Sequence, residues 1–142
     1  MEFRLFEIDD IKELAKTAVD KLVNRSSECD LLQYAEMNKQ SGPAFTGLYK
    51  GRPICAAGIN LRRNNSGHLW SIFTMSAQIH KKAVFKSLKL MLDLVIQNNN
   101  LKKIVTESRK GFIESQTLIE HLGFERQRRS FSNDYYFYRK VV

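Results

Sequence analysis

Residues 68–95 hold an apolar segment, a short polar junction and a periodic segment, and this succession limits the fold more than any other part of the chain. The apolar run Leu69–Met75 lacks strict alternation, which is typical of a central strand covered on both faces. From residue 83 to 95 apolar positions recur at helical spacing, and residues 102–108, "KKIVTES", have the composition of another strand. A strand, a helix and a strand in this order predict a right-handed crossover between two parallel strands.

The segments before and after this crossover predict the rest of one sheet and its helices. A short strand at residues 3–8 precedes a helix from Ile11 to Leu22, with Asp10 and Glu13 in the positions of a capping box. The other predicted elements are a helix at 28–38, strands at 44–49 and 54–61, a helix at 113–122 closed by Gly123, and strands at 125–131 and 135–141. The sequence therefore predicts an α+β (α/β) fold, with a mixed central sheet of about six or seven strands and helices on both faces.

Length and cysteine content predict one domain in a reducing compartment. The chain has 142 residues, the size of one ordinary domain spanning 1–142. No apolar run approaches the roughly 20 residues of a transmembrane helix, and "MEFRLFEIDD" lacks the basic start and apolar block of a secretory signal. Cys29 and Cys55 are too few for a disulfide framework, and no Cys/His cluster has zinc spacing. We therefore expect two reduced, buried thiols in a cytoplasmic protein and no metal site.

The charge of the chain is unevenly distributed. Residues 1–41 hold six Lys/Arg and nine Asp/Glu, whereas residues 42–142 hold seventeen and six. Lysines at positions 81, 82, 86 and 89 surround the start of the predicted central helix, where the helix dipole already contributes positive charge. We therefore expect an anionic ligand or cofactor at the Lys81–Lys86 turn, with a merely solvated basic surface as the alternative.

The order of elements, together with "SQTLIEHLGFERQ" at residues 115–127, resembles the GNAT fold of acetyl-CoA-dependent N-acyltransferases. That segment is similar to the family's late helix and its closing Leu-Gly-Phe, and the resemblance extends over nearly the whole chain. It implies acetyl-CoA as cofactor, with the pantetheine arm beside the central strand and the pyrophosphate on N–H groups at the helix start. It also implies that the two parallel strands splay at their C-terminal ends. The implied cofactor-binding residues are Phe73, Thr74, Met75, Lys81, Lys82, Ala83, Val84, Phe85, Lys86 and Ser115.

Three features depart from the pattern of this family. Ala83 and Phe85 stand where its pyrophosphate loop usually has glycines, which let a phosphate approach the backbone closely. Ile119 stands where the family often has a tyrosine that gives a proton to the leaving thiolate. The usual early-strand carboxylate is missing, because no Asp or Glu occurs between Asn60 and Asp93.

His68 and Glu107 are the candidate general bases that remain. Each has a simpler alternative, since His68 could be an exposed turn residue and Glu107 a solvated or capping carboxylate. His80 is expected to line the polar junction, and His121 is expected on an exposed helix face.

Phe85 has two possible orientations. Its spacing with Leu88 and Leu92 favours a ring turned toward the core, which would leave the N–H groups of Ala83 to Lys86 free for a pyrophosphate. A ring in the groove would instead exclude the cofactor.

Three functions are consistent with these observations. The first is acetyl transfer to an amine or protein substrate, with a backbone N–H of the Ile72–Met75 strand stabilising the oxyanion. The second is a non-catalytic interaction or assembly protein; a looser resemblance to diverged GNAT-like proteins of T7-type podophages would place it in the host cytoplasm or the virion. The third is a nucleic-acid-binding module, suggested by "ERQRRSFSNDYYFYRK", where Arg126, Arg128 and Arg129 mingle with Phe131 and other aromatic residues. The chain could also act as an oligomer.

Overall fold

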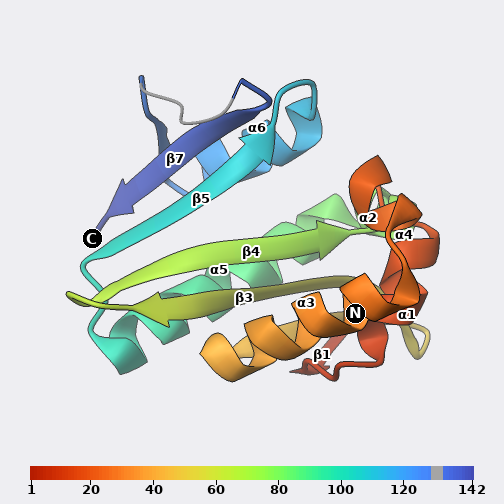
Figure 1. The fold of residues 1–142 in the computed structure, drawn as a ribbon. Helices are drawn as coiled ribbons and strands as arrows, with labels where there is room; N and C mark the ends of the chain where they lie inside the picture. Colours follow the sequence, from red (N-terminus) through yellow and green to blue (C-terminus); the bar gives the residue numbers. More distant parts are fainter. Residues whose placement is uncertain (129–132) are drawn as a thin grey trace.

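A computed structural model describes residues 1–128 and 133–142, whose strands form one seven-stranded mixed sheet in the order β1-β2-β3-β4-β5-β7-β6 (Figure 1). The strands are β1 (Glu2–Leu5), β2 (Ala44–Tyr49), β3 (Arg52–Arg62), β4 (Ser66–Phe73), β5 (Lys103–Arg109), β6 (Glu125–Arg126) and β7 (Tyr135–Val141). The helices are α1 (Asp10–Lys16), α2 (Lys21–Arg25), α3 (Glu28–Ser41), α4 (Met75–Ile79), α5 (Lys81–Asn99) and α6 (Ile113–His121). The predicted fold class is therefore confirmed.

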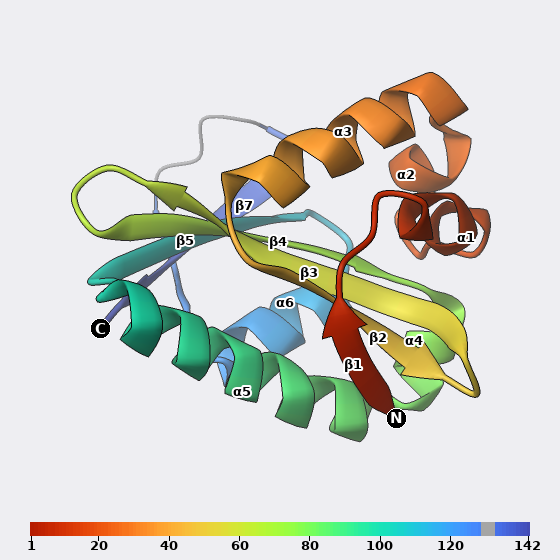
Figure 2. The same cartoon turned by 90° about the horizontal axis from the view of Figure 1, so that it is seen from below.

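The helices cover both faces of the sheet, with α1 to α3 on one side and α5 and α6 on the other (Figure 2). Trp70 and Ile72 of β4 belong to the core cluster formed with α1 and α3, whereas Leu69 belongs to the cluster formed with α5 and α6. Successive side chains of a strand point to opposite faces, so β4 is buried from both sides. This confirms the prediction made from its non-alternating apolar sequence.

The parallel pair of strands opens after three residue pairs. β4 and β5 pair in parallel at Ser66↔Lys103, Gly67↔Ile104 and His68↔Val105, and no pairing follows among the described residues. Thr106 instead donates its hydroxyl to the carbonyl oxygen of Leu69, at 2.8 Å. β5 stays paired with β7 along its whole length, while β4 and β5 diverge as expected (Figure 1).

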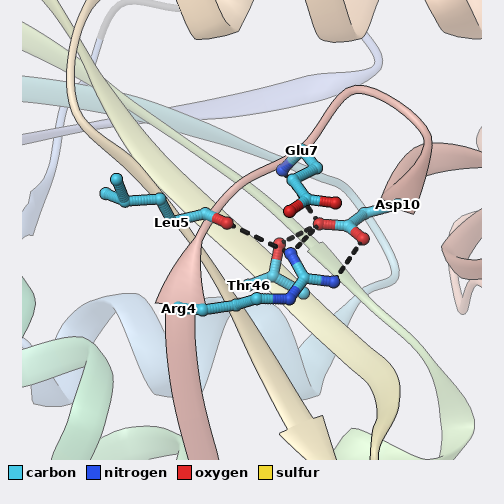
Figure 3. Close-up of polar contacts among 5 residues, drawn as sticks. All are labelled: Arg4, Leu5, Glu7, Asp10 and Thr46. Carbon is cyan, nitrogen blue, oxygen red and sulfur yellow. Dashed lines mark hydrogen bonds and ion pairs between the residues drawn. The ribbon is translucent and has the colours of Figure 1, made fainter.

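The predicted capping box at the first helix is wrong. Asp9, not Asp10, is the N-cap of α1, and its side chain makes no capping hydrogen bond. The buried Asp10 carboxylate instead accepts two hydrogen bonds from Arg4, both at 2.7 Å, one from the Thr46 hydroxyl at 2.7 Å and one from the Glu7 N–H at 2.9 Å (Figure 3). A buried carboxylate needs such partners, and this need outweighs local capping. Asp10 therefore joins β1, α1 and β2.

The predicted helix from Ile11 to Leu22 is interrupted. α1 ends at Lys16 and α2 begins at Lys21, while Ala18 forms an isolated antiparallel bridge with Thr74. The Asn24 side chain donates to the carbonyl oxygens at the end of α1, at 2.9 Å each. Long-range pairing thus overrides the continuous helical spacing of the sequence, and Leu22 is exposed.

Several smaller predictions can also be compared with the structure. Met75 lies in α4 and not in the central strand, and α5 (Lys81–Asn99) extends beyond the predicted periodic segment 83–95 at both ends. Gly123 adopts a left-handed conformation with φ +95°, as predicted. Cys55 is buried as expected, but Cys29 is exposed, because it lies on the outer side of α3. Arg129 and Phe131 lie outside the described residues.

None of the helices among the described residues is both long and apolar enough to cross a bilayer.

Candidate functional site

A cleft of roughly 2140 Å³ begins where β4 and β5 separate. One side is lined by residues of α5 and α6, and the other by residues of α2 and α3. Pockets for a single small molecule usually measure about 300–1,000 Å³. The cleft is thus large enough for an extended ligand and a second molecule that meets it from the opposite face of the sheet.

The first turn of α5 forms a basic wall of this cleft. Lys81, Lys82 and Lys86 are exposed and line it, together with Ala83 and Val84. The Val84 N–H donates to the carbonyl oxygen of His80 at 3.0 Å. The N–H groups without an intrahelical acceptor are therefore those of Lys81, Lys82 and Ala83. The expected range, Ala83 to Lys86, was placed too far along because α5 begins earlier than predicted.

The Phe85 ring packs between the core and the cleft wall. It is half-buried, contacts the core cluster that contains Leu88 and Leu92, and meets the His121 ring edge-on at a centroid distance of 6.3 Å. The ring thus leans toward the core, as its helical spacing predicted, and it also lines the cleft. His121 is exposed, as predicted. His80 stacks on Tyr49, with ring centroids 4.1 Å apart.

The two candidate bases are in contact on the opposite side of the cleft. Nε2 of His68 lies 2.7 Å from Oε2 of Glu107, and the side chains are 15% and 37% exposed. His68 lies two residues before Trp70 on β4, so the two side chains share the face of the sheet that α3 covers. A carboxylate held against an imidazole, open to the cleft, can accept a proton from a bound molecule.

Polar residues of α3 border this pair and were not singled out from the sequence. Tyr34 packs edge-on against Trp70, at a centroid distance of 6.1 Å, and burial raises the pKa of its hydroxyl. Asn60 donates to Asn38 at 2.8 Å. Among the described residues, the remaining amide nitrogen of Asn38 and amide oxygen of Asn60 make no hydrogen bond although they are buried. The spacing of Tyr34 and Asn38, one helical turn apart, was the available signal.

The chain was also compared with known proteins. No protein-family model and no curated protein matches its sequence. Among solved structures, it is similar to an acetyltransferase of the GNAT family from Bacillus anthracis, with 13% identity, a TM-score of 0.70, and coverage of 98% of this chain and 93% of that one. The chain has the GNAT acetyltransferase fold. A spermidine N-acetyltransferase variant from Vibrio cholerae has 15% identity and a TM-score of 0.72, with coverage of 99% and 95%. An aminoglycoside acetyltransferase in complex with coenzyme A has 16% identity and a TM-score of 0.73, with coverage of 98% and 93%.

The late helix has an apolar residue at the position where the family resemblance implies a tyrosine. Ile119 is 6% exposed and packs in the core with Leu122 and Phe124, so it faces away from the cleft. On the cleft side of the same helix, Ser115 accepts a hydrogen bond from Ser108 of β5 at 3.1 Å.

Phe73 at the end of β4 and the two residues after it have different surroundings. Phe73 lines the cleft. Thr74 is buried, and its hydroxyl donates to the carbonyl oxygen of Ile54 at 2.7 Å, so its side chain serves the structure. Met75 is exposed at the start of α4 and lies outside the cleft lining.

Proposed function

We propose that this chain is an N-acyltransferase that moves an acetyl group from acetyl-CoA to an amine. The observation that supports this most is the arrangement of the cleft. A basic helix N-terminus lies on one face of the splayed strands, and a hydrogen-bonded His68–Glu107 pair lies on the other. An anionic cofactor and a protonated amine would thus approach the gap between β4 and β5 from opposite sides.

The residues at the start of α5 fit a pyrophosphate. Free N–H groups of the first helical turn and the ammonium groups of Lys81, Lys82 and Lys86 supply donors and positive charge. Lysine side chains would here replace part of the close backbone approach that glycines allow. When bound, acetyl-CoA supplies the activated thioester carbonyl.

The opposite side of the cleft fits the acceptor amine. The His68–Glu107 pair would take a proton from the ammonium group, which frees the nitrogen lone pair for attack on the carbonyl carbon. The nitrogen would form the C–N bond as the C–S bond to CoA breaks, and the second proton that the nitrogen loses would neutralise the departing thiolate through solvent. The N–H of Phe73, on the β4 edge that β5 leaves, would stabilise the oxyanion. Much of the rate would come from holding both molecules in the gap.

A non-catalytic interaction protein is the second candidate. The inward-facing Ile119 favours it, because no general acid replaces the missing tyrosine at that position. A nucleic-acid-binding role has less support. Arg126 covers the Tyr136 ring, with its Cζ 3.4 Å from the ring centroid, and Nζ of Lys110 lies 5.2 Å from the same centroid. Cations of the fold itself therefore already contact this aromatic ring.

Calorimetric titration with acetyl-CoA separates these candidates. We expect saturable binding, followed by release of free CoA thiol when a panel of primary amines is added. Failure to bind acetyl-CoA would refute the acyltransferase proposal. Binding without thiol release from any amine would favour the non-catalytic alternative.

A further inference from the structure

The segment Thr17–Asp20, which joins α1 to α2, lies along the end of β4 like a short additional strand. The N–H of Val19 donates to the carbonyl oxygen of Phe73 at 2.9 Å, and the N–H of Met75 donates to that of Thr17 at 3.2 Å. Ala18 and Thr74 form the antiparallel bridge between these two bonds. The α1–α2 connection thus uses backbone groups at the end of β4.

These backbone groups belong to the edge of β4 that faces the cleft. The N–H of Thr74 points the other way, since it donates to Ile54 of β3 at 3.1 Å. The carbonyl oxygen of Leu69 points toward β5, where it accepts from Thr106. Backbone groups alternate between the two edges of a strand, so those of Phe73 and Met75 also point toward the β5 side. The segment therefore occupies the position from which β5 has splayed away, and α2 lies beside the tip of β4 (Figure 1).

Asp20 connects this segment to the end of β5, on the other side of the gap. Its carboxylate oxygen accepts from the N–H of Leu22, as the N-cap of α2, and from Nη1 of Arg109, the last residue of β5, at 2.9 and 3.0 Å. Both members of the ion pair are about one-third exposed, so it contributes little to stability. α2 has no buried residue. Ala18 is 7% exposed and packs in the core cluster with α1 and α3, so the contacts around Val19 and Asp20 are the weaker part of the segment and open first.

We propose that Thr17–Asp20 is a strap that closes the end of the β4 edge, and that an extended ligand lying along β4 displaces it. This inference rests on the proposed function, because the ligand considered is coenzyme A. On the part of this edge that the strap leaves uncovered, the backbone groups of Ser71 and the N–H of Phe73 point toward the β5 side. A pantetheine arm, which carries two successive amides, would continue past Phe73 and compete with the strap for the Phe73 carbonyl oxygen and the Met75 N–H.

Removing one strap contact at a time tests the competition. Val19→Pro deletes the N–H that donates to Phe73, whereas the matched control Val19→Ala shortens the side chain and keeps it. Arg109→Gln removes the ion pair to Asp20 and serves as a second release variant should the proline variant fold poorly. We expect Kd for coenzyme A to fall by roughly two- to tenfold in the release variants, the range of one lost hydrogen bond, and to stay unchanged in Val19→Ala. Equal affinity in all three variants and the parent would overturn the strap.

Amide hydrogen exchange gives an independent readout. In the free protein the amides of Val19 and Met75 should both be protected. Saturation with coenzyme A should expose the Val19 amide while the ligand keeps that of Met75 protected. Continued protection of Val19 in the saturated complex would mean that the segment is a fixed wall and would overturn the proposal.

Failure of the strap can be distinguished from failure of the proposed function. If neither the parent nor the release variants bind coenzyme A, the acyltransferase proposal is wrong, and exchange in the free protein then decides about the strap. A movable strap predicts that Val19 and Met75 exchange together, faster than the fully buried Leu92 of α5, and faster still in Arg109→Gln. Exchange of all these amides only through global unfolding would show that the segment does not open.

Discussion

His68 and Glu107 stand on the two strands that separate, and their side chains meet across the start of the gap with 2.7 Å between Nε2 and Oε2. Neither residue was predicted to contact the other, because their encounter depends on the register His68↔Val105 of a parallel pair. The register places residues 39 positions apart beside one another, on the face of the sheet that α3 covers. The first prediction follows from this contact.

Glu107→Gln should lower the turnover of acetyl transfer while leaving the Kd for acetyl-CoA unchanged. The substitution keeps the shape of the side chain but removes the proton acceptor, and general bases commonly contribute about 10²–10⁴-fold. The lysines of α5 lie on the opposite side of the cleft, so cofactor binding should not respond. Glu2→Gln, an exposed carboxylate on β1, is the matched control. Unchanged turnover in Glu107→Gln would show that the pair is structural.

The second prediction concerns the basic wall of the cleft. Changing Lys81, Lys82 and Lys86 together to Gln should abolish acetyl-CoA binding with little change in the free energy of unfolding, because positive charge at a helix N-terminus does not stabilise the helix. Calorimetry and urea denaturation measure the two effects. In the parent, affinity should also weaken with added salt, since these ammonium groups are exposed.

A charge-matched control makes the result specific to this site. Lys39, Lys102 and Lys103 are exposed and lie outside the cleft lining, so their joint replacement by Gln changes the net charge by the same amount. Equal affinities in both triple variants and the parent would identify the lysines of α5 as a solvated surface.

Local sequence patterns correctly predicted the helices and strands that tertiary contacts also favour. The strand at β4 and the helix α5 follow from an apolar run and a stripe of buried residues, and tertiary contacts reinforce both. The break at residues 17–20 was not predictable, since Ala18 and Val19 continue the helical spacing. Its cause is the bridge to Thr74, which is distant in sequence. Asp10 shows the same limit, because its partners on β1 and β2 decide its role.

The candidate site was predictable to a similar extent. The basic turn followed from a run of lysines beside a strand-to-helix junction, and the structure lines the cleft with it. The contact between Asn38 and Asn60 could not be predicted, because a contact between a helix and a strand leaves no periodic signal in one sequence.

The third prediction separates packing from helix propensity at Phe85. Phe85→Ala should destabilise the fold, because the ring packs against the core cluster and His121. The loss should fall below the roughly 3–5 kcal/mol of a fully buried aromatic ring, since Phe85 is half-buried. Phe85→Gly should cost about 1 kcal/mol more through its lower helix propensity. Acetyl-CoA affinity should stay similar or rise modestly in both variants, and a marked loss in Phe85→Ala would mean that the ring itself contacts the cofactor.

The fourth prediction concerns the two thiols. Burial raises the pKa of Cys55 to about 11, so this thiol remains protonated and shielded at neutral pH. Cys29 is exposed on α3. A thiol reagent such as Ellman's should therefore label one cysteine rapidly in the native protein and both in denaturant, and Cys29→Ser should remove the rapid phase. Rapid labelling of the native Cys29→Ser variant would contradict the burial of Cys55.

The last prediction concerns Asp10 and acid. Burial raises the pKa of its carboxyl group, but hydrogen bonds from Arg4, Thr46 and the Glu7 N–H outweigh it, so the net pKa is lowered from 3.8. A carboxylate with a lowered folded pKa stabilises the protein fully above its unfolded pKa, and this contribution is lost as the pH falls through the lower folded value. Asp10→Asn should therefore reduce the free energy of unfolding near neutral pH by about 1.5–3 kcal/mol, the range for a hydrogen bond to a charged group. Urea denaturation of the parent and the variant should show this difference constant from about pH 7 to pH 4 and shrinking below it.

Asp9→Asn is the neighbouring control, because the Asp9 side chain is 85% exposed, and this variant should match the parent at every pH. A constant difference between Asp10→Asn and the parent down to the lowest pH at which the protein folds would contradict a charge-dependent role for Asp10.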